Sequence, residues 1–167
     1  MLKEIYLAGG CFWGTEQAFK QLAGVTDTEV GYCNGHTANP TYKEVCTDTT
    51  GHRETVKVVY DPDVTSLATI MEAYFLCIDP TIANRQGGDI GSQYQTGVYY
   101  SDEGDLPFLS ELFAQKKKEY DPFLVELLPL DNFWPAEEYH QDYLVKNPHG
   151  YCHITSEEFE QVRKLNR

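Results

Sequence analysis

A cysteine near the start of the chain combines a nucleophilic side chain with a favourable local sequence. Cys11 follows two glycines, Gly9 and Gly10, and precedes residues with helical spacing. Glycine permits a tight turn, and the free N–H groups and dipole of a helix N-terminus stabilise an anion. This placement predicts a reactive thiol with a lowered pKa. The alternative is a small buried hydrophobic side chain, which is the usual environment of a free cysteine.

Polar side chains in unusual places are the candidates for its partners. Glu54 begins a predicted buried strand, although a surface salt bridge would also explain it. Tyr42, Asp89 and Tyr94 lie in predicted loops, where a rigid scaffold concentrates catalytic groups. His140 is on a predicted helix, where a histidine is more often structural than catalytic. We therefore take these five residues as candidates.

Two aromatic residues follow the thiol directly. Phe12 and Trp13 provide an apolar wall that suits a substrate bearing a methyl or alkyl group. Aromatic pairs also pack in cores, so the two rings alone do not indicate a binding site.

The five cysteines of the chain indicate a reducing environment. Their odd number cannot pair completely within one chain, no two form a C-x-x-C motif, and no histidine stands at zinc-ligand spacing. We expect no metal and no organic cofactor. The five cysteines are Cys11, Cys33, Cys46, Cys77 and Cys152.

Bulk composition excludes several classes of protein. The 167 residues are 41% hydrophobic and 23% charged, which is typical of one globular domain, and we assign residues 1–167 to it. A formal charge of −13 argues against nucleic-acid binding. Lys116 to Lys118 is interpreted as the solvated end of a helix. No apolar stretch approaches the ~18 residues of a membrane span, and the N-terminus lacks a signal-peptide pattern, so we expect a cytoplasmic protein.

Hydrophobic periodicity predicts an α+β fold. Strands are expected at 3–8, 25–33, 54–60 and 95–100, with an edge strand at 125–130. Helices are expected at 15–22 with a stop at Gly24, at 67–75 with Thr65 or Ser66 as cap, from 105, at 136–146, and in a short C-terminal segment capped by Ser156. The loops are 34–40 and 79–93. This order predicts a ferredoxin-like split βαβ plait, a mixed sheet with helices packed on it, followed by a long C-terminal coil or tail.

Several stretches together resemble the peptide methionine sulfoxide reductases of type A, which act on the S-epimer. The match covers nearly the whole chain in the expected order. It rests on Gly10 to Glu16, Gly31-Tyr32, Asn39 to Cys46, Thr50 to His52, Val59 to Pro62, Arg85 to Tyr94, Ala136 to Gln141 and Asn147 to Cys152.

The resemblance implies a role for each candidate. Cys11 would attack the sulfoxide sulfur and become a sulfenic acid, while Glu54 protonates the oxygen. Tyr42 and Tyr94 would assist by hydrogen bonding. Asp89 would order the polar network, Phe12 and Trp13 would receive the methyl group, and His140 would lie beside them. A carboxyl group must hold its proton to act as an acid, so burial should raise its pKa.

The resemblance also implies how the enzyme is recycled. Cys152 would be the resolving cysteine that forms a disulfide with Cys11, and thioredoxin would reduce that disulfide. Cys33 and Cys46 remain possible resolving residues, although we expect both to be structural because they lie on or beside predicted core elements. A monomer is expected.

Three departures from the family and two alternative functions stay open at this point. Cys33 and the pair Cys77-Ile78 replace residues usual in the family, and the glycine-rich tail of some members is replaced by a charged helix. A cysteine hydrolase would need His52 or His140 as a base within reach of Cys11. A redox-sensing or oxidised-protein-binding module would bind sulfoxide without turnover.

Overall fold

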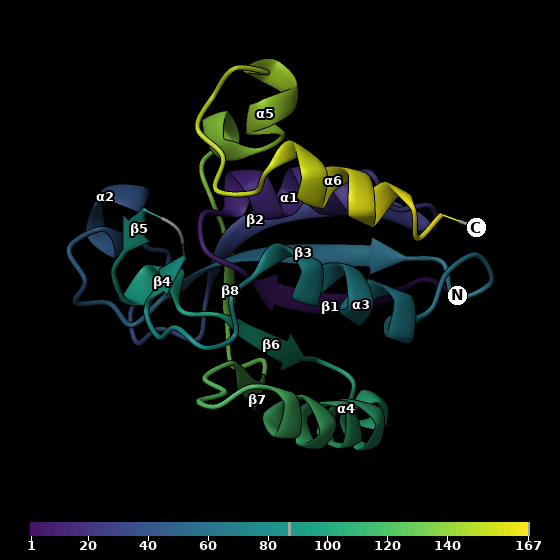
Figure 1. Ribbon diagram of the computed structural model, residues 1–167. Coiled ribbons are helices and arrows are strands. Elements are labelled where there is room, and N and C mark those ends of the chain that lie inside the picture. The colour runs from purple at the N-terminus through teal and green to yellow at the C-terminus, as the bar shows by residue number, and fades with distance from the viewer. Residues whose placement is uncertain (87, 167) are drawn as a thin grey trace.

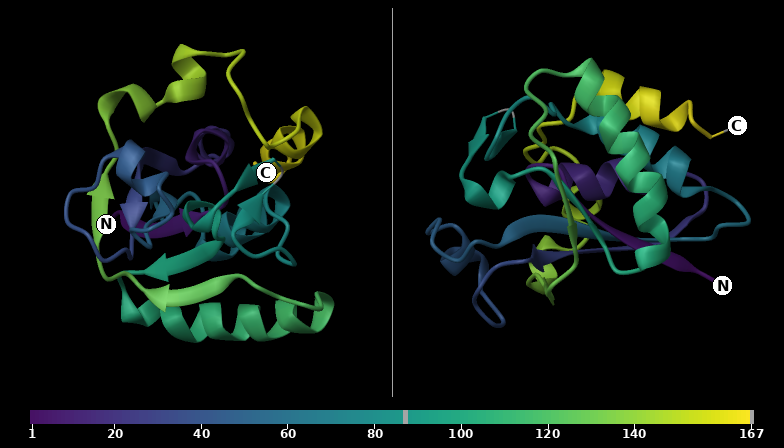
Figure 2. Two further views of the ribbon diagram at one scale, coloured as in Figure 1. Left: turned by 90° about the vertical axis from the view of Figure 1, so that its left-hand side faces the viewer. Right: turned by 90° about the horizontal axis from the view of Figure 1, so that it is seen from below.

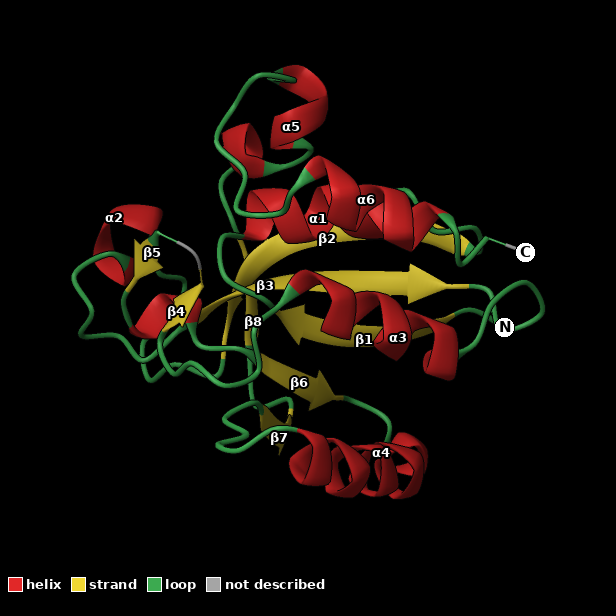
Figure 3. Ribbon diagram, viewed as in Figure 1, coloured by secondary structure: helices red, strands yellow, loops and turns green. Residues whose placement is uncertain are grey.

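A six-stranded mixed sheet forms the centre of the computed structural model, which describes residues 1–86 and 88–166. The strand order is β7-β6-β1-β3-β2-β8, and Figures 1 and 3 show the twisted sheet. All its neighbouring pairs are antiparallel except β6 and β7, which are parallel. The strands are β1 Lys3–Ala8, β2 Val25–Cys33, β3 Arg53–Tyr60, β6 Gly97–Tyr100, β7 Glu126–Pro129 and β8 Phe133–Pro135.

Alternation along the strands separates two faces. Ile5, Leu7, Val56 and Val58 are fully buried on one face, in the main core. The opposite face carries a smaller cluster of Tyr6, Ala8, Cys33 and Tyr99, packed against Leu130 and Phe133. Side chains two residues apart share a face of a strand, so alternation along β1 and β3 places these apolar residues together.

Helices cover the main core. α1 Phe12–Lys20 packs on β2 and β3, and it contacts α3 Leu67–Cys77 and α6 Ser156–Arg163. These three helices lie on the same side of the sheet in Figures 1 and 2. α4 Leu106–Glu119 lies at the β7 edge, and Lys116 to Lys118 occupy its last turn, as predicted. No helix in the described part of the chain is long and apolar enough to cross a membrane.

The expected α+β class and five expected strands are confirmed, with ends shifted by a few residues. The predicted loop 79–93 contains a small hairpin, β4 Arg85–Gln86 and β5 Asp89–Ile90, followed by the 3-10 turn η1 Ser92–Tyr94. Gly87, part of the motif quoted there, lies outside the described residues. β8 was not predicted, since three residues are too few to show alternation.

The expected helix at 136–146 is wrong. A 3-10 turn, η3 Glu138–His140, is separated from the four-residue α5 Tyr143–Lys146 by Asp142, whose φ of 53° lies in the left-handed region. The expected coil tail is also partly wrong, because α6 occupies much of it. Thr155, not Ser156, caps α6 through a capping box with Glu158.

Two further helix starts are set by side-chain caps. Ser66, one of the two expected caps of α3, accepts a hydrogen bond from the Thr69 N–H. The short α2 Tyr42–Val45, which was not predicted, begins with a capping box between Thr41 and Glu44. This box fixes the start of the turn that carries Tyr42.

Tyr74 fixes the end of β1 next to the glycine turn. Its fully buried hydroxyl on α3 donates to the Ala8 carbonyl at 2.7 Å and lies 3.3 Å from the Gly97 carbonyl on β6. One helix side chain thus joins two neighbouring strands where β1 leads into Cys11.

We expect Tyr74→Phe to destabilise the protein by about 1–3 kcal/mol, because a buried hydrogen bond is lost without water to replace it. Urea unfolding measures this change. Tyr6→Phe is the matched control, since the Tyr6 hydroxyl bonds only to the half-exposed Glu4 carboxylate, and should cost about 0.5 kcal/mol or less. Equal losses in the two variants would contradict this account.

Candidate active site

Cys11 lies at the N-terminus of α1, where the sequence predicted it. It is the N-cap residue, with extended backbone angles, and its side chain is only 6% exposed. Gly10 precedes it with a φ of 84°, and a Cβ placed there would lie 2.6 Å from the Gln86 Cβ. Glycine is therefore required at position 10 for the turn and for its approach to the hairpin.

The expected lowering of the Cys11 pKa is wrong for the protein without substrate. Burial raises the pKa of the thiol, and the carboxyl groups of Glu54 and Asp89 raise it further. The Trp13 N–H favours the thiolate, in the sense of the helix N-terminus argument, but burial outweighs it. Cys11 is therefore a protonated thiol at neutral pH until its surroundings change.

Glu54 is a buried acid beside this thiol. It is 1% exposed, and its Oε1 accepts a 3.2 Å hydrogen bond from the N–H of Phe12, the residue after Cys11. Burial raises its pKa to about 8, against the opposing effect of that hydrogen bond. Its Oε2 is buried and has no hydrogen-bond partner in the described structure. Glu54 therefore holds a proton at neutral pH, and the surface salt bridge considered from the sequence is not formed.

Two tyrosines lie around the Glu54 carboxyl group. Tyr42, at the start of α2, and Tyr94, at the end of η1, are both half-buried. Burial raises the pKa of both hydroxyls, and Glu54 is the charged group that adds most to each shift. The Tyr42 hydroxyl also interacts with the side chains of Tyr94 and Cys46. Both tyrosines are therefore neutral hydrogen-bond donors.

Aromatic rings form a wall on the other side of the α1 N-terminus. Phe12 is buried with its ring 5.2 Å from that of His140, and Trp13 is half-buried and stacks on Tyr143 at 3.8 Å. The indole N–H of Trp13 donates to His140 Nδ1 at 3.0 Å, and the Tyr42 ring lies 4.6 Å from the imidazole. Burial lowers the His140 pKa, so His140 is neutral, with its proton on Nε2.

Glu137 holds this wall against the sheet, and sequence reasoning assigned it no role. One oxygen accepts from the Tyr32 hydroxyl at 2.9 Å and the other from the Tyr42 N–H at 3.0 Å. Tyr32 is directly opposite Glu54 in the pairing of β2 with β3. Glu137 thus links the segment containing His140 to β2 and to α2. Its place within a family-like stretch was the available signal.

Asp89 lies on the opposite side, on β5. It is half-buried, its Oδ2 accepts from the Tyr151 hydroxyl at 3.1 Å, and burial raises its pKa. Its charge acts on Cys11, Glu54 and His153. Asp89 therefore connects the hairpin to the segment that carries Cys152.

Cys152 packs against the first turn of α1. A Cβ placed on Gly14 would lie 2.9 Å from the Cys152 Sγ and 3.3 Å from His153 Nδ1. Cys152 also raises the pKa of the Cys11 thiol, which shows that the two thiols are electrostatically coupled. All five cysteines are free. The structure thus brings Cys152 to the thiol-bearing turn in the reduced state.

The other cysteines differ in position. Cys33 is fully buried on the opposite face of the sheet, where it bonds to Thr55 at 2.9 Å. Cys77 is buried in the main core. Cys46 is exposed at the end of α2, so the expectation that it is structural because it lies beside a core element is not supported by its burial. The Cys46 side chain interacts with that of Tyr42.

His52 does not face Cys11. Its Nδ1 accepts from the Gly35 N–H at 3.2 Å, and its Nε2 lies 2.8 Å from the Thr37 carbonyl. Both ring nitrogens are therefore used to fix the loop after β2. His140 Nδ1 likewise accepts a hydrogen bond from Trp13 Nε1. The two histidines named as bases for a cysteine hydrolase, His52 and His140, therefore have no free acceptor nitrogen.

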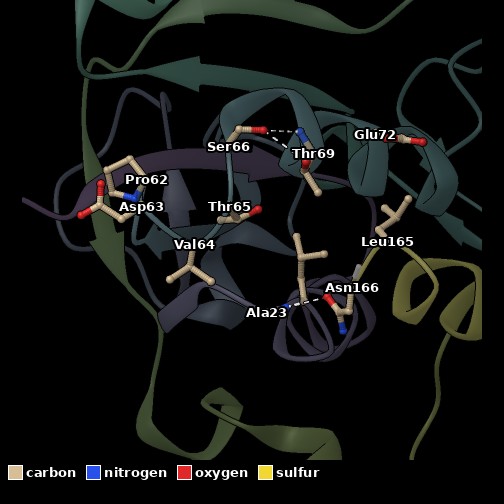
Figure 4. Close-up of a pocket in the computed structure, with 11 residues that line it drawn as sticks. Ala23, Pro62, Asp63, Val64, Thr65, Ser66, Thr69, Glu72, Leu165 and Asn166 are labelled. Carbon is tan, nitrogen blue, oxygen red and sulfur yellow. Dashed lines mark hydrogen bonds between the residues drawn. The ribbon is translucent and has the colours of Figure 1, made fainter.

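A separate cavity of about 370 Å³ lies between the end of α1, the start of α3 and the C-terminal residues (Figure 4). Its lining contains no cysteine, histidine, lysine or arginine, and Ser66 there is occupied as the α3 cap. Within residues 1–86 and 88–166, no cluster of three His, Cys, Asp or Glu side chains could hold a metal ion.

Comparisons with known proteins agree with this geometry. The profile of the family described as peptide methionine sulfoxide reductase matches residues 3–166. A peptide methionine sulfoxide reductase MsrA of Clostridium acetobutylicum is 52% identical over 157 residues, which cover 93% of this chain and 97% of the relative.

Solved structures extend the match to the fold. Mxr1 of Saccharomyces cerevisiae in reduced form aligns with a TM-score of 0.87 and 36% identity, covering 92% of this chain and 91% of Mxr1. The crystal structure of Mxr1 in complex with Trx2 aligns with a TM-score of 0.59 over 85% and 84% of the two chains, at 24% identity, and shows the fold alone. With its sequence match extending from residue 3 to residue 166, this chain belongs to the peptide methionine sulfoxide reductase family.

Proposed function

We propose that this methionine sulfoxide reductase uses Cys11 as its nucleophile and Glu54 as its general acid. The observation that carries the proposal is the buried, protonated Glu54 held by the N–H of the residue after Cys11. A carboxyl group that keeps its proton to a pKa of about 8 can donate it at neutral pH. The unpartnered Oε2 is the oxygen from which this proton would leave.

The first half-reaction balances with these two groups. Glu54 gives its proton to the sulfoxide oxygen as the Cys11 sulfur bonds to the sulfoxide sulfur. That S–S bond and the S–O bond of the substrate then break as the oxygen bonds to the Cys11 sulfur. The oxygen is transferred to Cys11 as a sulfenic acid, the substrate sulfur is reduced to the thioether of methionine, and the thiol proton of Cys11 returns to Glu54. Tyr42 and Tyr94 donate hydrogen bonds to the oxygen, which adds stabilisation where charge develops.

The aromatic wall provides the binding site for the substrate. The methyl group would contact Phe12 and Trp13, and the buried Nε2–H of neutral His140 is a further donor beside them. Asp89 would order the polar groups on the hairpin side through Tyr151. Specificity for the S-epimer would follow from the fixed positions of this wall and the acid on different sides of Cys11.

The second half-reaction regenerates the thiol. Cys152 attacks the sulfenic acid of Cys11, a disulfide forms, and water leaves. Thioredoxin would then reduce the disulfide, as the low potential of its dithiol allows. The related Mxr1 has been crystallised with Trx2. The five free cysteines suit a reducing compartment such as the cytoplasm, and the proposed state is a monomer acting on free or protein-bound methionine sulfoxide.

The same inference extends to the architecture. The order β6-β1-β3-β2, with α1 and α3 on one face, supports a ferredoxin-like split βαβ plait as the core of the fold. β7 and β8 would be additions at its two edges, within one domain spanning residues 1–167.

We expect Cys11→Ser to abolish turnover of methionine S-sulfoxide with dithiothreitol as reductant, because the hydroxyl of serine cannot take the oxygen and be reduced again. Methionine formation measured by chromatography tests this. Cys33→Ser is the matched control, since Cys33 lies on the opposite face of the sheet. Equal rates for wild type and Cys11→Ser would refute the assignment.

We expect Glu54→Gln to lower the rate of methionine formation in a single turnover by about 10²–10⁴-fold, the usual contribution of a general acid. In the wild type, the acid function should be lost as pH rises through about 8.

The pH dependence of the free energy of unfolding provides an independent readout. An unfolded Glu54 ionises near 4.5, whereas the folded one ionises near 8, so wild-type stability should fall between these pH values. Glu54→Gln should lack that component, and an unchanged pH dependence would contradict the assigned burial.

We expect Cys152→Ser to release one equivalent of methionine at the wild-type rate but to lose thioredoxin-supported cycling. The sulfenic acid of Cys11 would then have no thiol in place to resolve it. Burst stoichiometry and steady-state rates with thioredoxin measure the two effects, with Cys77→Ser as a buried-thiol control. Full cycling by Cys152→Ser would move the resolving role to Cys46 or Cys33.

A further inference from the structure

His153 is a half-buried histidine with buried ring nitrogens, and the first half-reaction does not use it. Both of its ring nitrogens are inaccessible to solvent and make no hydrogen bond of good geometry in the described structure. A buried polar atom without a partner costs free energy, so such an atom calls for an explanation. The residue follows Cys152 directly in the sequence.

The imidazole lies against the turn that carries Cys11. A Cβ on Gly10 would be 3.3 Å from His153 Cε1, and a Cβ on Gly14 would be 3.3 Å from His153 Nδ1. Cys11 lies between these two glycines in sequence. The ring therefore packs along the start of α1 on the side from which Cys152 approaches, where Figure 1 shows the chain between α5 and α6 running past α1.

His153 is also close to the sulfur of Cys152. The Cys152 Sγ and His153 Nδ1 both lie near the same point, the Cβ position of Gly14, at 2.9 and 3.3 Å. The absence of a side chain at position 14 lets both groups sit on the helix together. The Cys152 thiol and an unpartnered imidazole nitrogen of His153 therefore both pack on Gly14, in the turn that follows Cys11.

The resolving step requires a proton carrier. Burial raises the pKa of the Cys152 thiol, so it is protonated at neutral pH, and only a thiolate is an effective nucleophile. The oxygen leaving Cys11 must also gain a proton to depart as water. The proton that the Cys152 sulfur loses is therefore needed by the oxygen that leaves the Cys11 sulfur.

We propose that His153 is the proton carrier of the resolving step, which deepens the proposed function and rests on it. The imidazole takes the proton from the Cys152 thiol as its sulfur bonds to the Cys11 sulfur. The S–O bond of the sulfenic acid breaks, and His153 passes the proton to the departing hydroxide, which leaves as water. The Cys11 sulfur is reduced and the Cys152 sulfur is oxidised to the disulfide level, so no other reactant is needed.

Surrounding charges suit both states of the ring. Burial lowers the His153 pKa from 6.5, so the resting ring is a neutral base. The carboxyl groups of Asp89 on β5 and Glu158 on α6, with the Gly9 backbone, favour the protonated ring. The other titratable groups facing this place are the thiols of Cys152 and Cys11. The transient imidazolium therefore has carboxyl groups nearby to stabilise it.

The test separates the two half-reactions in the full chain. Reduced protein is mixed with one equivalent of methionine S-sulfoxide, and released methionine, dimedone-trapped sulfenic acid and disulfide are followed over time. We expect His153→Gln to release methionine at the wild-type rate while disulfide formation slows at least about 10²-fold at pH 7 and the sulfenic acid accumulates. His149→Gln, an exposed histidine of the same segment, is the matched control and should behave as wild type.

The pH profile distinguishes proton transfer from packing. In His153→Gln the defect should shrink as pH rises toward the pKa of the Cys152 thiol, because the thiolate then forms without a base. A defect equal at every pH, or a wild-type rate of disulfide formation, would overturn the proposal.

Wild-type protein gives a second reading that does not depend on the folding of a variant. Its disulfide formation should level off at a pH below 6.5, the ordinary pKa of histidine, and a rate that instead rises in proportion to hydroxide between pH 6.5 and 8 would overturn the role of His153. If wild type releases no methionine at all, the proposed function fails instead, and the two failures are thereby distinguished.

Discussion

One buried carboxyl group constrains the rest of the site. Glu54 lies on the same face of β3 as Val56, Val58 and Tyr60, so the alternation that builds the core also buries it. An unpaired carboxylate buried there would destabilise the fold, and Glu54 avoids this free-energy cost by keeping its proton. Its hydrogen bond from the Phe12 N–H ties β3 to the first turn of α1. Acid and nucleophile are therefore set by the pairing of the central strands and the docking of one helix.

The same burial explains why the resting thiol is not a thiolate. Burial of the site disfavours a negative sulfur, and Asp89, with Glu54 once it has given up its proton, would repel it. Among the neighbouring carboxyl groups, Glu54 raises the pKa of the Cys11 thiol most. In the proposed reaction the substrate oxygen takes the Glu54 proton, and Glu54 can then accept the thiol proton of Cys11. Reactivity is thus conditional on the oxygen being present, which protects the resting thiol.

Sequence reasoning succeeded where periodicity is local and failed where long-range contacts decide. β1, α1 and β3 follow from alternation and helical spacing, and the same pattern buries Glu54. The segment from Ala136 onwards looks helical, yet Glu137 and Gln141 bind it to β2 and Glu16 binds the Asp142 N–H to α1. The helical pattern breaks at Asp142. The Cys11 pKa was predicted with the wrong sign because a helix N-terminus is visible in the sequence, whereas burial and two approaching carboxyl groups are not.

The C-terminal segment depends on glycine in the helix it covers. Gly14 is on the first turn of α1, and any side chain there would displace both the Cys152 sulfur and the His153 ring. Helix propensity disfavours glycine at such a position by about 1 kcal/mol relative to alanine. Glycine at position 14 nevertheless allows the segment with Cys152 and His153 to pack closely on the helix. Cys11, the proposed nucleophile, is the N-cap of α1, and the proposed resolving segment packs on Gly14, three residues later. The proposed disulfide would therefore form between two segments that already lie against the same helix turn.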